Sequence, residues 1–93
     1  MAEASARSAR RRAGAGRDLA AFADVPEVAR VLVRLLLDAE DTAVTRETAR
    51  ALAEAGTPAA SGVVARGLAA ADDSRADWIE TGVWDALADD ARR

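Results

Sequence analysis

The sequence contains no cysteine, no histidine and no lysine. Without thiolates and imidazoles there is no Cys or His ligand for zinc, no cysteine nucleophile and no histidine base. Disulfide bonds are excluded as well, and the serines lack a His or Lys partner that would activate them. We therefore expect a protein that is not an enzyme, needs no metal or cofactor, and has no small-molecule substrate.

Aromatic residues make up only 3% of the chain, and no stretch alternates β-branched or aromatic residues with polar ones over the length of a strand. Alanine, the strongest helix former, supplies 26 of the 93 residues. The predicted fold class is all-α.

Bulky apolar side chains are also scarce, because Leu, Val, Ile and Phe together supply 18 residues. Burial stabilises a fold by roughly 25 cal/mol per Å² of apolar surface, and alanine contributes little area. We expect a thin core, closely packed helices and marginal stability.

The segment 26–41 is the most apolar stretch and the expected centre of the fold. Its apolar residues recur at helical spacing and predict a helix over 26–38 with this inward face: Val28, Val31, Leu32, Leu35, Leu36. Three further helices are expected over 42–55, 58–71 and 75–90, and a short helical turn around Leu19, Phe22 and Val25. The helix over 75–90 is expected to face inward with Ile79, Val83, Ala86 and Leu87. The expected signals at their ends are Asp24 with Pro26, Asp41 or Thr42, Gly56, and Thr57 with Pro58.

Charge divides the chain near residue 17. Residues 1–17 carry five arginines against Glu3 (+4), whereas residues 18–93 carry eight arginines against fifteen acids (−7). Gly14 and Gly16 are expected to interrupt the first part. We interpret this part as a basic flexible leader (1–17), either a disordered tail or a frayed helix, before a helical-repeat domain (18–93). The leader lacks the apolar run of a secretory signal and the large side chains of a membrane anchor. Its use of Arg and Ala is typical of a GC-rich bacterial gene, so a bacterial cytoplasmic protein is expected.

The two halves of the domain repeat. A shift of 35 residues superposes Val28 on Val63 and Asp38 on Asp73, and it also superposes three positions of the following helix: Val44 on Ile79, Ala51 on Ala86, Leu52 on Leu87. The order helix, acidic turn, helix occurs twice, with a period typical of helical-repeat proteins.

The run LLLDAEDTAVTRETARALAEAG resembles a HEAT-type helical repeat. Its features are a Leu-rich helix entering an acidic turn (35–38), a Val-x-Arg element (44–46) and an Ala-x-x-Leu ending (49–52). The second unit, GLAAADDSRADWIETGVWDALAD, keeps the turn and the Ala86-Leu87 ending but has Trp78, Ile79 and Glu80 in place of Val-x-Arg. The resemblance covers residues 26–90. It implies two antiparallel helical hairpins, as a right-handed α-solenoid fragment or small bundle, that bind other macromolecules.

Two units are fewer than the three that usually make a solenoid stable. The missing neighbour could be the segment 19–25, a second copy of the chain or another protein, and we expect self-association. The side chains expected to reach a protein partner are Trp78, Trp84, Arg46 and Arg50; alternatively, each tryptophan covers an edge of the core.

An alternative function is nucleic-acid binding through the basic leader: Arg7, Arg10, Arg11, Arg12, Arg17. These arginines could neutralise phosphates. No aromatic residue lies among them to stack on a base, and the rest of the chain is acidic. We therefore favour a solubilising role for them, with docking on the acidic body of another copy as a third possibility. The acids at 38–41 and 72–77 are expected to lie at helix ends rather than to bind a cation.

Overall fold

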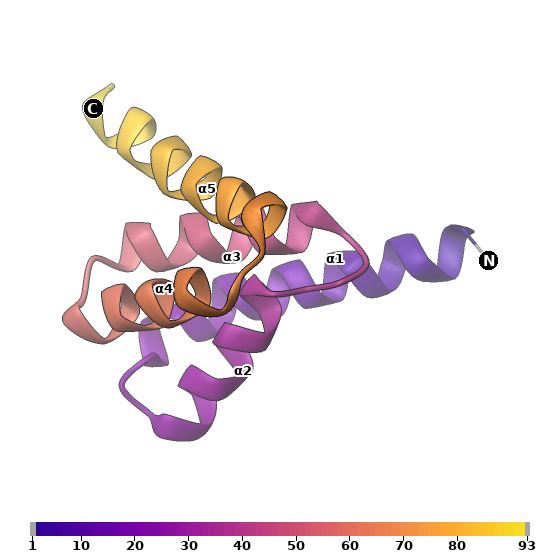
Figure 1. Ribbon diagram of the computed structural model, residues 1–93, viewed down its shortest axis with the longest axis horizontal. Helices are drawn as coiled ribbons and strands as arrows, with labels where there is room; N and C mark the ends of the chain where they lie inside the picture. The colour runs from indigo at the N-terminus through magenta and orange to yellow at the C-terminus, as the bar shows by residue number, and fades with distance from the viewer. Residues whose placement is uncertain (1, 93) are drawn as a thin grey trace.

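The computed structural model describes residues 2–92, with side chains described from residue 7. Within this range the chain forms five α-helices and one turn of 3₁₀-helix, and the all-α prediction is confirmed (Figure 1). The elements are α1 (Ala2–Leu19), η1 (Ala20–Phe22), α2 (Pro26–Leu36), α3 (Thr42–Ala55), α4 (Pro58–Ala70) and α5 (Asp73–Ala91). The four helices expected from the sequence are all present, with ends that differ by two residues at most.

Helix α3, not α2, is the centre of the fold. It packs against all four other α-helices, and its most extensive contact is with α5. α1 lies along the flank of α3 that carries Thr48, and α5 along the flank that carries Arg46 and Ala49. α2 and α4 pack against each other and against α3. The many large apolar residues of α2 correctly indicated a buried helix. The centre of the fold is nevertheless α3, because its small side chains let neighbouring helices approach on several sides.

Two glycines lie where neighbouring helices meet α3 most closely. A Cβ built on Gly82 of α5 would lie 2.8 Å from the Ala49 Cβ and would overlap the Arg46 carbonyl oxygen. A Cβ on Gly16 of α1 would lie 3.0 Å from the Thr48 Cβ. Both helices therefore approach α3 at a distance that a larger residue would prevent.

The expected flexible leader is instead most of a helix. Residues 2–19 form α1, which continues through Gly14 and Gly16 and packs on α3. Its buried face consists of small residues at helical spacing, Ala9, Ala13 and Gly16. The packing of α1 on α3 was not predicted, because this interface is made by close backbone approach and not by large apolar side chains. The boundary at residue 17 falls inside the helix.

Most of the helix ends follow the sequence signals. Gly56 adopts a left-handed conformation (φ 64°) after α3, and Asp41 caps the start of α3 by accepting from the Ala43 N–H at 2.8 Å. Thr57 and Asp72 cap α4 and α5 in the same way. Asp24 does not cap α2: the position belongs to Val25, whose side chain cannot accept a hydrogen bond.

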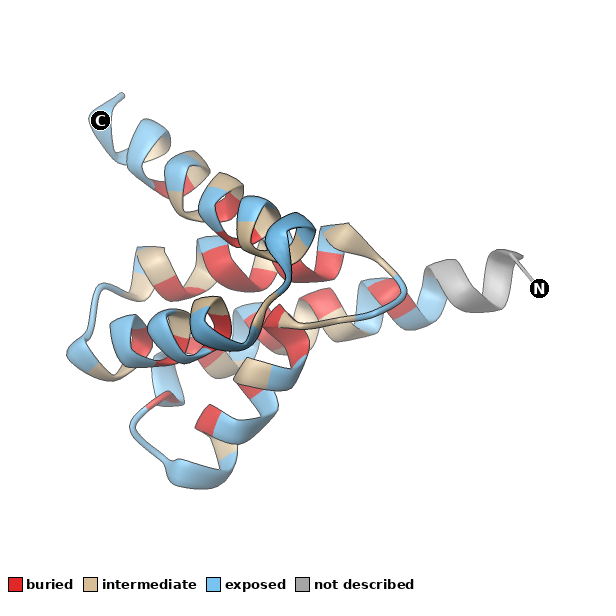
Figure 2. Ribbon diagram, in the orientation of Figure 1, coloured by how far each residue is buried: buried red, intermediate tan, exposed pale blue. Residues whose placement is uncertain are grey.

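The core is small and rich in alanine, as expected. Within residues 7–92, eight of the fifteen buried apolar residues are alanines. The largest fully buried apolar side chains come from α2, α3 and α5: Leu32, Leu36, Leu52, Ile79. Figure 2 shows the buried stretches, in red, on the sides of the helices that face one another. The Cα radius of gyration, 12.3 Å, is that of a compact chain of this length. Two residues expected to face inward, Val31 and Leu87, are exposed. The inward face of α5 is Ile79, Gly82 and Ala86, which turns Leu87 outward.

Two threonines of α3, Thr45 and Thr48, are fully buried, and neither Oγ1 has a hydrogen-bond partner within the described residues. An unpaired buried hydroxyl destabilises a fold by about 1–3 kcal/mol. We predict that Thr45→Val, which keeps the shape and removes the hydroxyl, raises the free energy of unfolding by about 0.5–1 kcal/mol. Denaturant titration measures the change.

The matched control is Thr57→Val. The Thr57 Oγ1 accepts from the Ala60 N–H at 3.1 Å, so this substitution should lower the free energy of unfolding by about 1 kcal/mol. Equal destabilisation by both substitutions would show that the Thr45 hydroxyl is satisfied in solution.

Candidate interaction surface

The arginines proposed from the sequence to contact a partner, Arg46 and Arg50, are used within the chain. The Arg46 Nε donates to Asp85 Oδ2 at 2.6 Å, and Arg50 pairs with Asp89, also on α5. The hydrogen bond from Arg46 lowers the pKa of Asp85, against a smaller opposing effect of desolvation. Both arginines therefore form ion pairs that link α3 to α5.

Ion pairs also link α1 to α3 and to the turn that precedes α3. The Arg17 Nη1 lies 2.5 Å from Glu47 Oε2 on α3. Arg12 donates from Nε (2.7 Å) and Nη2 (3.3 Å) to the two oxygens of Asp38, in the turn between α2 and α3. Asp38 also accepts from the backbone N–H groups of Glu40 and Asp41. Partial burial acts to raise the pKa of Asp38, but the hydrogen bonds from Arg12 and these N–H groups outweigh it and hold the pKa below its usual value.

Asp38 should therefore make part of the stability depend on pH. Because its pKa is lower in the folded chain than in the unfolded one, its contribution is present above the unfolded value, about 3.9, and is lost as the pH falls through the folded value. We predict that Asp38→Asn lowers the free energy of unfolding by about 1 kcal/mol at pH 7 and by much less below pH 3.

Denaturant titrations from pH 2.5 to pH 7 test this, with Asp24→Asn as the control because Asp24 is exposed and caps no helix. The same difference between Asp38→Asn and the unchanged chain at every pH would contradict the prediction.

The structure brings Trp78 together with Arg46 and Arg50 but places Trp84 elsewhere. Trp78 is partly buried and lines a shallow hollow of about 400 Å³ between α3 and α5, along with both arginines and Asp85. Trp84 is 69% exposed on the side of α5 turned away from α3.

Trp84 belongs to an exposed stripe along α5. Leu87, 52% exposed, lies three residues further on, and residues at helical spacing continue the stripe toward the start of the helix. We call this stripe the Trp84 face: Asp73, Asp77, Glu80, Trp84, Leu87. Its three acids make no ion pair within the described residues.

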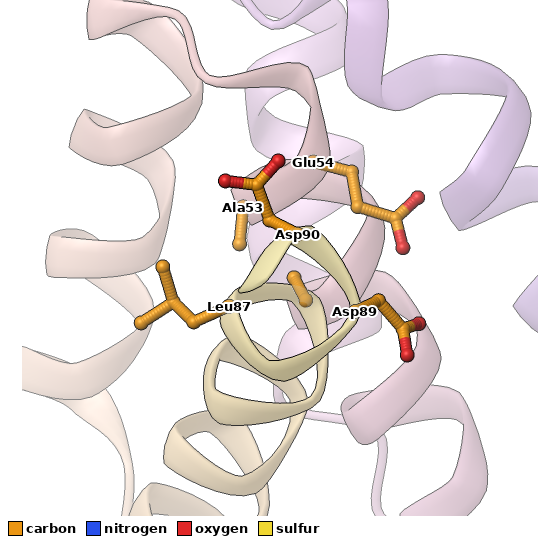
Figure 3. A pocket seen from close by; sticks show the side chains of 6 residues that line it. Ala53, Glu54, Leu87, Asp89 and Asp90 are labelled. Atoms are coloured by element: carbon orange, nitrogen blue, oxygen red, sulfur yellow. The ribbon is translucent and has the colours of Figure 1, made fainter. Parts of the chain in front are cut away.

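Leu87 connects the Trp84 face to a hollow of about 420 Å³ beside the end of α3, which is also lined by Ala53, Glu54 and Asp89. Figure 3 shows Leu87 and Asp89 on opposite sides of α5. The sequence analysis missed Leu87 because its repeat position predicted burial. Gly82, which lies beside the predicted face of α5, was the available sign that this helix is rotated.

A second exposed stripe lies on α1. Arg7, Arg10 and Arg11 are exposed at spacing i, i+3, i+4 and make no ion pair within residues 7–92. We call them the Arg stripe. The other two leader arginines, Arg12 and Arg17, form the ion pairs between α1 and the rest of the chain. The five leader arginines thus divide into two that are used internally and three that face outward.

The other acids have structural positions. Asp38, Asp41 and Asp72 bond to backbone N–H groups at helix starts. Among the described residues, no group of three or more acids is arranged to hold a metal ion. Nor does any helix of the described part combine the length and apolar character needed to cross a lipid bilayer.

Comparison of the chain with models of protein families, with curated proteins and with solved structures finds no match.

Proposed function

We propose that this chain is a non-enzymatic protein–protein interaction module that self-associates through the Trp84 face. The exposure of Trp84 and Leu87 on consecutive turns of α5 carries the proposal. A tryptophan side chain presents roughly 150–250 Å² of surface, and burying most of it in a partner contributes about 3 kcal/mol. Exposed tryptophans are frequent hot spots of protein interfaces.

The packing of the helices supports a HEAT-like arrangement as part of this proposal. α2 packs on α4 and α3 packs on α5, so that corresponding helices of the two units lie together, and α1 packs on α3 from the other side. In a solenoid each unit is covered by the next. Leu52 of α3 is 1% exposed, whereas its repeat counterpart Leu87 is 52% exposed. This difference is expected if α5 lacks the neighbour that α3 has.

Light scattering coupled to size exclusion tests the proposal. The weight-average mass of the unchanged chain should rise above 9.7 kDa as its concentration increases. We predict that Trp84→Ala weakens this association at least about tenfold, as expected for a central interface tryptophan, while the helical content stays unchanged because Trp84 contributes little to the core.

The matched control is Phe22→Ala, which truncates another exposed aromatic side chain, 56% exposed, at the end of η1. It should leave association unchanged. Equal weakening by both substitutions, or a mass of 9.7 kDa at every concentration, would contradict the proposal.

A second candidate function is an accessory role in nucleic-acid binding, and the outward direction of the Arg stripe favours it. Three arginines that neutralise phosphates would give an affinity that falls with the salt concentration. Filter binding of RNA and DNA between 50 and 200 mM salt distinguishes this function, since replacing Arg7, Arg10 and Arg11 with alanine would then abolish retention and leave the mass of the chain unchanged.

A further inference from the structure

We infer that the partner bound by the Trp84 face is helix α1 of a second copy, docked through its Arg stripe, so that chains join head to tail. The inference rests on the proposed self-association and adds which two surfaces meet. It is argued from charge, from the way the chain packs its own helices, and from the directions of the two surfaces.

The two surfaces are complementary in charge. Within residues 7–92 the three acids of the Trp84 face have no ion-pair partner, and neither have the three arginines of the Arg stripe. Guanidinium groups also bind favourably over the face of an indole ring. An Arg-rich helix laid along α5 would pair Asp77 and Glu80 with cations and bring another close to Trp84.

The chain already builds two junctions of this type. α1 meets α3, and α3 meets α5, through a glycine at the closest approach and arginine–carboxylate pairs beside it, as in Arg17 with Glu47 and Arg46 with Asp85. The outer face of α1 offers the same elements, because Gly14 follows Arg10 and Arg11 at helical spacing. If α1 of a second copy packed on α5 in this way, the series of neighbouring helices α1, α3 and α5 would continue into that copy.

The directions of the surfaces exclude simpler arrangements. α1 and α5 lie on opposite flanks of α3, so one copy cannot join its own Arg stripe to its own Trp84 face. Of the Arg stripe, Arg10 lies nearest to α3, in a hollow that it lines with Ala43 and Glu47. A symmetric contact of α5 with α5 would place Asp73, Asp77 and Glu80 of both copies in one interface, and the Trp84 face contains no cation to pair with them. A contact between two different surfaces repeats from copy to copy and produces open chains or rings. One helix-on-helix contact buries less than the roughly 800 Å² per partner of a standard interface, so the assembly should be weak and dependent on concentration.

Charge reversal tests the inference by sedimentation velocity. One variant carries Arg7→Glu, Arg10→Glu and Arg11→Glu. Because the three positions are exposed and glutamate is a good helix former, α1 should remain folded. The other carries Asp77→Arg and Glu80→Arg on α5. Each variant alone should remain at 9.7 kDa because its two surfaces then have the same charge. An equimolar mixture should associate again, because every junction between unlike copies pairs opposite charges.

The matched control replaces three other exposed arginines with glutamate, Arg30, Arg34 and Arg66. It changes the net charge by the same amount as the Arg-stripe variant and should associate like the unchanged chain. Circular dichroism establishes that each variant is folded.

The outcomes separate the inference from the proposed function. Recovery of association only in the mixture supports the inference. If the charge-reversed variants associate normally while Trp84→Ala does not, or if the mixture fails to recover, the head-to-tail junction is wrong and self-association through Trp84 remains. If the unchanged chain is monomeric at every concentration, both the head-to-tail junction and the self-association are wrong.

Discussion

Replacing Gly82 with leucine should unfold the protein or leave it without stable tertiary structure. A Cβ at this position would lie 3.0 Å from the Arg50 backbone nitrogen and overlap the Arg46 carbonyl oxygen. Because these are backbone atoms, no side-chain rotation relieves the overlap, and α5 would have to leave its most extensive contact. We expect a loss of more than about 3 kcal/mol, a large part of the stability of a small domain. The disappearance of a cooperative thermal transition in circular dichroism measures it.

The control for this substitution is Gly62→Leu in α4. Gly62 is exposed, and a Cβ there would meet no atom within 4 Å. Leucine has a higher helix propensity than glycine, so this variant should be more stable by about 0.5–1 kcal/mol. If Gly82→Leu and Gly62→Leu had the same stability, the close contact of α5 with α3 would be wrong.

Truncation of Leu36 to alanine should be the most damaging change in the core. Leu36 is fully buried at the end of α2 and lies against Gly67 of α4. Leucine-to-alanine substitutions at such sites lower the free energy of unfolding by about 2–5 kcal/mol, and we expect the upper half of this range because the rest of the core is mostly alanine. Denaturant titration measures the loss, and Val31→Ala on the exposed side of α2 should cost less than about 1 kcal/mol.

Leu36 and Gly67 also form a testable pair. A Cβ on Gly67 would come within 2.7 Å of the Leu36 Cδ1, so Gly67→Ala alone should destabilise the protein. In the Leu36→Ala background the same methyl group enters the space that the leucine leaves, and its effect should be reduced or reversed. Additive effects of the two substitutions would show that the two helices do not meet at these residues.

Helices α2 to α5 and most of their ends were predictable because they depend on local signals. Pro26, Asp41 and Gly56 act within one or two turns of their own positions, and the structure uses each as expected. The position of α3 at the centre was not predictable from hydrophobicity, since α2 carries more large apolar residues. Close packing through glycine and alanine leaves no strong periodic signal in a sequence that is rich in alanine throughout.

The candidate surface was predictable only in part. Trp84 was identified because an isolated tryptophan is conspicuous, and the Arg stripe because arginines were counted in the leader. Arg46 and Arg50 were proposed as partner contacts because the acids with which they pair on α5 could not be recognised from the sequence. These acids, Asp85 and Asp89, lie 39 residues away. Long-range ion pairs of this kind depend on the packing of α3 against α5, which no local pattern encodes. Leu87 was misplaced for the same reason, since the rotation of α5 is set by Gly82.

Disulfide trapping tests the head-to-tail contact most directly, because the chain has no cysteine of its own. One variant carries Arg11→Cys on α1 and the other carries Glu80→Cys on α5. Under mild oxidation the mixture should form the mixed disulfide dimer several times faster than either variant forms a disulfide with itself, and Trp84→Ala in the second variant should slow the reaction. Faster dimerisation of the Glu80→Cys variant with itself would contradict the head-to-tail contact and indicate a symmetric contact between two copies of α5.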